Sequence, residues 1–231
     1  QGIQMVYGDD AYVYYAISSD YDISVTKMSI DGVQEWSISA VTNSADDIIK
    51  AMYSYPNGGC IIIYESQSFI EGSHIYALAI DLDGSIISGW PLSISDLSGN
   101  QYYESSLATD LGIIITFKDQ TSGNYDIYSQ YFSFNGNLNF SASGQLIASG
   151  DNDEQNSLVK MGSNPDNIFI CYELQAESET DLYCVEMDIN VITVGEPIII
   201  SDNSYNQKNP QIINSDSGYL IVWEDNRNSS N

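Results

Sequence analysis

A run of apolar residues that ends in an aromatic side chain recurs five times along the chain, about every fifty residues. Successive terminal aromatics lie 49 to 55 residues apart. They are Tyr15, Tyr64, Phe117, Tyr172 and Trp223. Because self-similarity at a fixed period marks repeat architectures, each unit of about fifty residues is predicted to be one copy of the same supersecondary structure.

Two further elements recur in the same order within the units. After a polar loop comes a short motif of the Asp-Ile-Tyr type, which begins at Asp22, His74, Asp126 and Asp181. Nine residues later comes a turn: Asp31-Gly32, Asp83-Gly84, Asn135-Gly136 and, in degenerate form, Asn190-Val191. Asp-Gly and Asn-Gly between alternating apolar residues are strong β-hairpin signals, so each full unit is predicted to hold four short strands.

The predicted fold class is all-β, and the architecture is a β-propeller of four-stranded antiparallel blades. No window shows the 3.6-residue period of an amphipathic helix. Stacked blades cover one another, which explains why the second strand of each unit is apolar on successive residues. The blades are expected at residues 1–47, 48–103, 104–155 and 156–209, with a partial blade at 210–231. A β-sandwich of about ten strands is the alternative, but sandwiches do not repeat their turn chemistry at a fixed period.

The chain therefore holds about four and a half blades, and half a blade leaves strand edges unpaired. We expect residues 1–231 to be a single propeller domain or the N-terminal part of one. In the second case, further blades or domains follow Asn231 and complete a ring of six to eight blades. The alternative is a five-bladed ring closed by an irregular join between the termini.

The charge of the chain excludes several classes of partner. There are 32 acidic residues against 6 basic ones, and the formal net charge is -26. Nucleic-acid binding is not expected, because phosphate contacts need clustered Lys and Arg. Docking on anionic membranes is not expected, because the chain is strongly negative. Membrane insertion is not expected either, since no apolar stretch reaches the length of a span. A single arginine and the abundance of Asp, Asn, Ser and Tyr favour an extracellular or cell-surface location.

Three cysteines are too few for a disulfide framework. Cys171 and Cys184 fall on neighbouring predicted strands and could pair across them. The more common state of such cysteines is that of small buried hydrophobic residues. The sequence leaves both states open.

The first turn resembles a known propeller motif. Ser29 to Trp36 is similar to the Asp-box, a Ser-x-Asp-x-x-x-x-Trp hairpin of sialidase-like and sortilin-like propellers. Ser133 to Phe140 is a weaker match, with Asn and Phe substituted. The resemblance implies that the carboxylate at the Asp position caps backbone N–H groups of its own turn, and it says nothing about chemistry.

The whole unit resembles a group of secreted bacterial propeller repeats. Their pattern is Gly-apolar-apolar-Val-Trp-x-Asp-x-Arg, then Asp-Ile-Tyr, then Asn-Gly. Gly218–Arg227 and Asn124–Gly136 carry the resemblance closely, and the other units carry it loosely. It implies a secreted or surface protein and a propeller architecture, and it implies no activity.

No catalytic motif is present, so the chain is expected not to be an enzyme. Arg227 is the one arginine, whereas sialidases need an arginine triad for the substrate carboxylate. His74 is the one histidine, and no zinc spacing, phosphate loop or nucleophile elbow occurs. The alternative is a five-bladed glycoside hydrolase-like enzyme that uses a pair of carboxylates. Asp47 and Asp110 are the candidates for it, although solvated loop residues are the simpler interpretation.

The predicted function is a non-catalytic binding, adhesion or spacer module that recognises a glycan or a protein through one rim of the propeller. Loops between second and third strands and between blades share this rim. Its aromatic residues are Tyr21, Tyr102, Tyr103, Tyr125 and Tyr205. Aromatic rings beside amides and carboxylates suit sugar stacking or a protein interface.

No cofactor is required by the sequence, but calcium is a candidate ligand. Asp151 and Asp153 offer closely spaced carboxylate oxygens, which suit a hard cation. The run does not match the twelve-residue EF-hand loop. A solvated charge run is the alternative interpretation.

Overall fold

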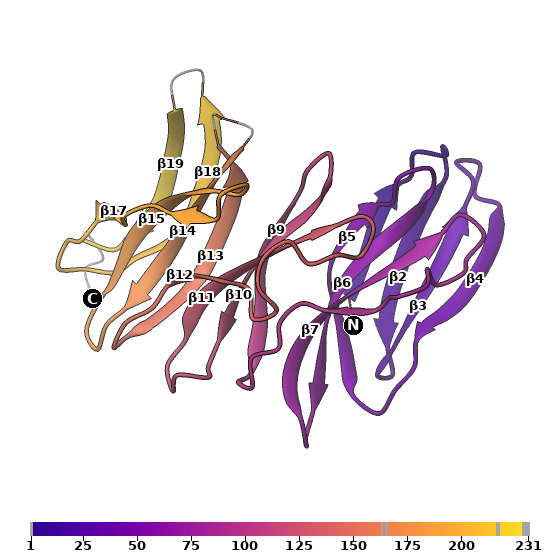
Figure 1. Ribbon diagram of the computed structural model, residues 1–231, viewed down its shortest axis with the longest axis horizontal. Coiled ribbons are helices and arrows are strands. Elements are labelled where there is room, and N and C mark those ends of the chain that lie inside the picture. The colour runs from indigo at the N-terminus through magenta and orange to yellow at the C-terminus, as the bar shows by residue number, and fades with distance from the viewer. Residues whose placement is uncertain (1, 163, 165, 216–217, 228–231) are drawn as a thin grey trace. The chain divides into compact units, whose positions relative to one another are not determined.

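The computed structural model describes residues 2–162, 164, 166–215 and 218–227, and these residues form an all-β fold without helices. Successive strands pair with their neighbours in four-stranded antiparallel sheets, as predicted (Figure 1). The first sheet holds β1 (Gly2–Tyr7), β2 (Val13–Ser19), β3 (Asp22–Met28) and β4 (Gln34–Val41). The second holds β5 (Asp46–Ser54), β6 (Gly59–Ser68), β7 (Gly72–Asp81) and β8 (Leu92–Ser93).

The third and fourth sheets repeat this order. The third holds β9 (Gln101–Ala108), β10 (Gly112–Asp119), β11 (Asp126–Ser133) and β12 (Gln145–Ala148). The fourth holds β13 (Asp153–Met161), β14 (Asn167–Gln175), β15 (Thr180–Asp188) and β16 (Thr193–Val194), and β17 (Ile198–Ser201) also pairs with β15. A last hairpin consists of β18 (Gln207–Ser215) and β19 (Gly218–Asp225). This is the strand order of propeller blades.

The chain divides into two compact units, and the division passes through the third sheet. The first unit comprises Gln1–Tyr103, Asp110–Gly112 and Phe132–Ser143. The second comprises Glu104–Thr109, Ile113–Tyr131 and Gly144–Asn231. In the first unit β5 packs against β1, β2 and β3, and in the second β18 packs against β13, β14 and β15. Each unit therefore stacks sheet on sheet.

The second strand of the sheets forms the core. Ile61, Ile62 and Ile63 of β6 are consecutive, and all three are buried. Ile113, Ile114 and Ile115 of β10 are likewise buried. Consecutive burial means that both faces of the strand are covered, since neighbouring side chains point to opposite faces of a sheet. Continuous apolar runs in the sequence are the result.

The turns are capped by the residue that opens them. Ser29 Oγ accepts a hydrogen bond from Val33 N, and Ser133 Oγ accepts one from Asn137 N. Asp81 Oδ1 accepts from Ser85 N at 2.8 Å, and Asp188 Oδ1 accepts from Asn190 N at 2.8 Å. The resemblance to the Asp-box implied Asp31 as the capping residue of the first turn. The hydroxyl two residues earlier makes this bond instead, because it lies at the base of the hairpin.

In the first unit, a tryptophan near the fourth strand of one sheet packs on the glycine turn of the next sheet. Trp36 Nε1 donates to Leu82 O, and a Cβ atom at Gly84 would lie 3.0 Å from the Trp36 ring. A Cβ atom at Gly136 would likewise lie 3.2 Å from Trp90 Nε1. Both glycines have positive φ, 86° and 80°. The turn conformation and the close indole ring therefore both require glycine there.

A disulfide joins Cys171 and Cys184, which are direct partners in the register of β14 and β15. Of the two states that the sequence left open, the structure has the paired one. The disulfide lies in a core cluster with Phe169 and Ile212. Cys60 is free and buried, and burial raises the pKa of its thiol to about 12. Within the described part of the chain, no helix has the length and apolar character needed to cross a membrane.

Candidate active site

Three sheets carry a stacked aromatic pair between the second strand and the third. In the second sheet Tyr64 lies opposite Tyr76, and their ring centroids are 5.6 Å apart. In the fourth sheet Tyr172 lies opposite Tyr183, and the centroids are 5.9 Å apart. Phe117 and Tyr128 form the pair of the third sheet. The first member of each pair is the terminal aromatic of the repeated apolar run.

A buried polar side chain lies at the first or second position of the first strand in each of the later sheets. Asp47, Gln101, Glu154 and Gln207 are at most 3% exposed. In each, at least one side-chain oxygen lacks a hydrogen-bond partner. The backbone N–H of Asp47 donates to Tyr21 O, and that of Glu154 donates to Tyr125 O. Asp47 and Glu154 thus occupy equivalent places in the two units.

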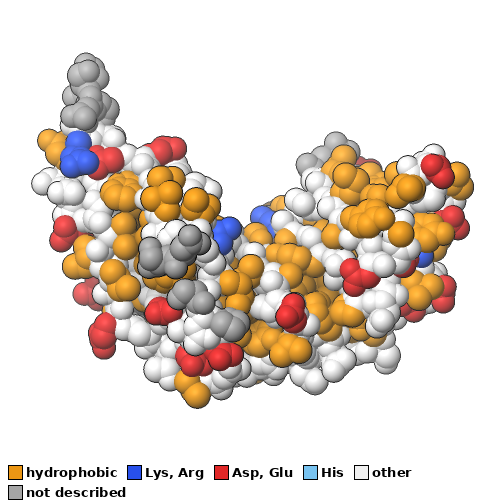
Figure 2. Space-filling model, turned by 90° about the horizontal axis from the view of Figure 1, so that it is seen from above, with side chains coloured by type: hydrophobic (Ala, Val, Ile, Leu, Met, Phe, Trp, Pro, Cys, Tyr) orange, Lys and Arg blue, Asp and Glu red, His pale blue; other side chains and the backbone are white. Residues whose placement is uncertain are grey.

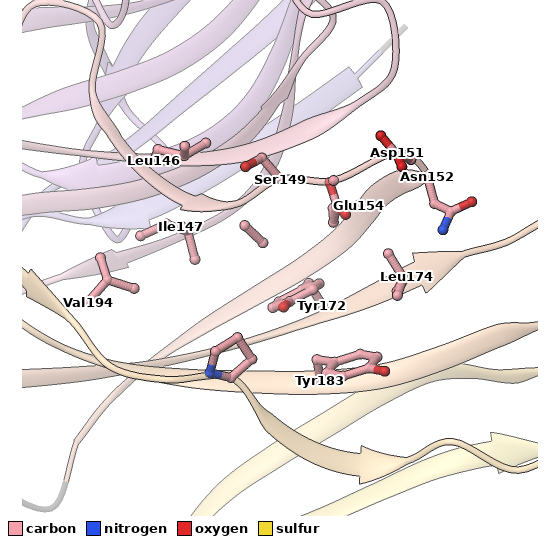
Figure 3. A pocket seen from close by; sticks show the side chains of 13 residues that line it. Leu146, Ile147, Ser149, Asp151, Asn152, Glu154, Tyr172, Leu174, Tyr183 and Val194 are labelled. Atoms are coloured by element: carbon pink, nitrogen blue, oxygen red, sulfur yellow. The ribbon is translucent and has the colours of Figure 1, made fainter.

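Glu154 opens onto a pocket of about 500 Å³ in the second unit (Figure 3). The pocket is bounded by the strand and loop at residues 146–152 on one side and by the face of the fourth sheet on the other. The aromatic pair Tyr172 and Tyr183 lies on this face, together with Leu174. The remaining lining residues are Leu146, Ile147, Ala148, Ser149, Gly150, Asp151, Asn152, Val194 and Pro197. An apolar pocket with a few convergent polar groups is the usual form of a small-ligand site.

The carboxyl group of Glu154 is kept in its acid form to an unusually high pH. Burial, followed by the charges of Asp126 and Asp153, raises its pKa from 4.5 to about 7. Burial and the charge of Glu154 raise the pKa of Tyr172 to about 12. A carboxyl group of this kind can donate a proton near neutral pH, which an ordinary glutamate cannot do.

Two loops hold Glu154 in place. Tyr125 N donates to Asp153 Oδ1 at 2.9 Å, and Asn124 Nδ2 donates to Gly150 O at 2.8 Å. The ammonium group of Lys118 lies 4.6 Å from the centroid of the Tyr125 ring. The loop after β10 is therefore bonded to the loop that leads into β13, and these bonds fix the start of the strand that carries Glu154.

The first unit contains a counterpart of this pocket. It has a volume of about 420 Å³ and is lined by Tyr64 and Tyr76. His74 and Ser66 take the places that Asp181 and Leu174 have in the register of the fourth sheet. Asp47 does not line this pocket. It lines a separate pocket of about 290 Å³ with Asp20, Tyr21 and Asp46.

Asp47 itself is buried, although the sequence favoured a solvated loop residue. Burial, with the charges of Asp22 and Asp46, raises its pKa, and Ser66 and Asn43 partly oppose this. Asp110, the other carboxylate that the sequence offered for a hydrolase, is exposed. The difference follows from strand position, since Asp47 lies within β5 and Asp110 lies in a turn.

The five rim tyrosines do not line the Glu154 pocket. Tyr21 is 62% exposed and Tyr205 is 50% exposed. Tyr102, Tyr103 and Tyr125 are half-buried. Their role in ligand binding stays a prediction.

The predicted calcium ligands lie beside Glu154. Asp151 is exposed and lines the pocket, whereas one carboxylate oxygen of Asp153 is taken by the backbone of Tyr125. Among the residues that the structure describes, no three His, Cys, Asp or Glu side chains are grouped so that they could hold a metal ion. Calcium binding also stays a prediction.

No protein-family model and no curated protein matches the chain. Solved structures do match. A crystal structure of an α-L-arabinofuranosidase from Lactobacillus brevis aligns with a TM-score of 0.50 and 11% identity, over 96% of this chain and 82% of that one. The catalytic domain of an α-L-arabinofuranosidase from Coprinopsis cinerea aligns with a TM-score of 0.42 and 11% identity, over 100% and 86%. TolB from Acinetobacter baumannii aligns with a TM-score of 0.39 and 13% identity, over 96% of this chain and 52% of that one.

The fold is a β-propeller. The described residues form about four and a half blades, counted from the four sheets of four or more strands and the final hairpin. At 11% identity the likeness establishes the fold alone. Any activity has to be argued from the pocket of this chain.

The comparisons correct the functional expectation. A non-catalytic binding, adhesion or spacer module was predicted, and an enzyme was not. An α-L-arabinofuranosidase is among the structural neighbours, which favours the alternative, a glycoside hydrolase-like enzyme. The expectation was wrong because the missing Arg, His and Cys motifs exclude several chemistries but not the one that needs only two carboxylates.

Proposed function

We propose that this propeller is a glycoside hydrolase-like enzyme whose general acid is Glu154. One observation carries the proposal: a carboxyl group that is 3% exposed, with its Oε2 unbonded, lines a pocket beside two stacked tyrosine rings. Its raised pKa suits proton donation to a leaving group. Stacked rings suit the apolar face of a sugar.

The reaction requires a second carboxylate, and Asp151 is the candidate. It is exposed, and it lines the same pocket as Glu154 (Figure 3). Glu154 gives its proton to the glycosidic oxygen as the bond from that oxygen to the anomeric carbon breaks. Water adds its oxygen to the anomeric carbon, and its proton passes to Asp151. Return of that proton to Glu154 through solvent restores the enzyme.

An oxidising compartment is part of the proposal. The disulfide between Cys171 and Cys184 supports it, because such cross-links form and persist outside the cytosol. A secreted enzyme meets polymeric and oligomeric glycosides there.

The test is hydrolysis of a panel of aryl glycosides by the full chain, with α-L-arabinofuranoside, β-xyloside, β-glucoside and β-glucosaminide members. We expect at least one member to be cleaved, with a rate that falls as the pH rises through about 7 and Glu154 loses its proton. A panel without any cleavage would contradict the proposal. So would a rate that climbs through the same range.

A further inference from the structure

Tyr183, at one end of the Glu154 pocket, has two carboxylates as neighbours. Burial and then the charges of Asp181 and Asp202 raise the pKa of Tyr183. Asp181 lies on the same face of β15 as Tyr183, and one of its oxygens is buried without a hydrogen-bond partner. Asp202 directly follows Ser201, which pairs with Leu182 between these two residues. Glu179 in turn raises the pKa of Asp181. Two carboxylates, those of Asp181 and Asp202, therefore adjoin this ring, and Glu179 adjoins Asp181.

No basic side chain in the pocket neutralises these carboxylates. None of its lining residues is Lys, Arg or His. Four of the six basic residues of the chain are engaged elsewhere, in ion pairs with Asp10, Glu65, Glu104 and Asp225. Figure 2 shows how few blue side chains reach the face that it presents. The field at the pocket is therefore that of an acidic protein with a formal charge of -26.

We propose that the Tyr183 end of the pocket binds a protonated amine on the sugar, and hence that the substrates are glycosides of amino sugars. This inference rests on the proposed hydrolase function and names its substrate class. An ammonium group gains from both the ring face and the carboxylates. A uronic acid at the same place meets like charge, and a neutral sugar gains only from stacking.

Independent evidence for a ligand at this pocket comes from its other end. Glu154 is more than nine-tenths buried, and its free Oε2 belongs to a residue that lines the cavity. A buried polar atom without a partner carries a desolvation penalty, which a bound ligand with a donor or acceptor can relieve. The acidic residues at the Tyr183 end therefore adjoin a cavity that already has an unsatisfied group.

Calorimetric titration tests the inference with three oligosaccharide probes of equal length. These are a glucosamine trisaccharide at a pH where its amines are protonated, the N-acetylated trisaccharide, and trigalacturonate. We expect the glucosamine trisaccharide to bind at least about tenfold more tightly than its N-acetylated form, and trigalacturonate not to bind. The gap between the affinities for the glucosamine trisaccharide and its N-acetylated form should narrow in Asp181→Asn and Asp202→Asn and at high salt. Asp83→Asn, an exposed turn residue outside the pocket, is the control with the same change of charge and should keep the gap.

The outcomes separate the inference from the function on which it rests. Preferential binding of the amine without hydrolysis of any glycoside would support the inference and contradict the hydrolase. Hydrolysis without any preference for the amine would overturn the inference and leave the hydrolase standing. Equal affinities for the first two probes, or a gap that the Asp83→Asn control closes as well, would also overturn it.

Discussion

The two pockets that share an aromatic pair differ in the polar groups around it. In the second unit, Tyr172 and Tyr183 lie beside the buried acid Glu154 and close to Asp181. In the first unit, Tyr64 and Tyr76 lie beside His74 and Ser66, and the equivalent acid, Asp47, opens onto another pocket. The fold thus places a stacked tyrosine pair in a pocket of each unit. The two pockets differ in the side chains at a few positions, and we assign the chemistry to the one that contains the buried acid.

This comparison also separates what a blade needs from what a site needs. The aromatic pairs recur in three sheets, so they belong to the way a blade is built. The buried acid that faces a pocket next to such a pair occurs in the second unit. What distinguishes Glu154 from its buried equivalents is the pocket that it shares with an aromatic pair, and this makes it the better functional candidate.

The largest expected effect is the loss of hydrolysis in Glu154→Gln. The amide keeps the shape of the side chain but cannot donate a proton to the leaving group. With a poor leaving group, such as a second sugar, we expect kcat to fall by about 10³-fold. With 4-nitrophenol, which leaves without protonation, the loss should be much smaller. Initial rates on both substrate types measure the difference.

The matched control for that variant is Asp47→Asn at the equivalent position of the first unit. It should change kcat by no more than a few-fold, because Asp47 does not line a pocket with an aromatic pair. If Asp47→Asn abolished hydrolysis and Glu154→Gln did not, the active site would belong to the first unit.

The next largest effect concerns the strands beneath the aromatic pairs. Cys171 and Cys184 precede and follow Tyr172 and Tyr183 in their strands, so the disulfide holds the register of this pair. The counterpart residues are Ile63 and Ala77. The double variant Cys171→Ile with Cys184→Ala places the same apolar residues at these positions as in the second sheet, so it keeps apolar packing there and removes the cross-link. We expect it to lose about 3 kcal/mol of unfolding free energy in a urea titration.

The same titration on the reduced wild-type protein is the control, and it should show a comparable loss. Unchanged midpoints in both samples would mean that packing alone fixes the register in the second unit, as it does in the first.

A smaller effect is expected in the pH dependence of stability. Because the pKa of Glu154 is about 7 when folded and near 4.5 when exposed, the folded state holds the proton more tightly. Its contribution is complete below about pH 4.5 and is lost as the pH rises through about 7. The wild type should therefore lose about 2 kcal/mol more than Glu154→Gln over that range, allowing for partial screening by solvent. Urea titrations between pH 4 and pH 8 measure it, and parallel curves for the two proteins would contradict it.

Much of the fold was predictable from the sequence because it depends on local signals. The glycine turns after Asp31, Asp83 and Asn135 place the hairpins, and the apolar runs place the buried strands. These signals act within a few residues of chain, so neither distant contacts nor knowledge of the ring was needed. The four-stranded sheets confirm the prediction.

The site was not predictable, because it depends on which face of a strand a residue takes. Asp151, Asp153 and Glu154 are close together in one acidic run, and the sequence suggested calcium ligands there. β13 begins at Asp153, so the next residue points inward and becomes the buried acid. A shift of one residue in the strand would have exposed it. The signal that could have found Glu154 was its alignment with Asp47, one residue after an aspartate that opens a first strand.

The smallest effect is expected at His74, where the equivalent sheets carry Asp126 and Asp181. The imidazole donates from Nε2 to Glu71 O in an exposed setting, at 2.8 Å. His74→Asp restores the repeated residue, and the unfolding free energy should change by no more than about 0.5 kcal/mol. A loss above about 1 kcal/mol would show that this bond holds the loop. The variant should not create hydrolysis at the Tyr64 and Tyr76 pocket, because a carboxylate near the rings does not replace a buried acid that opens onto them.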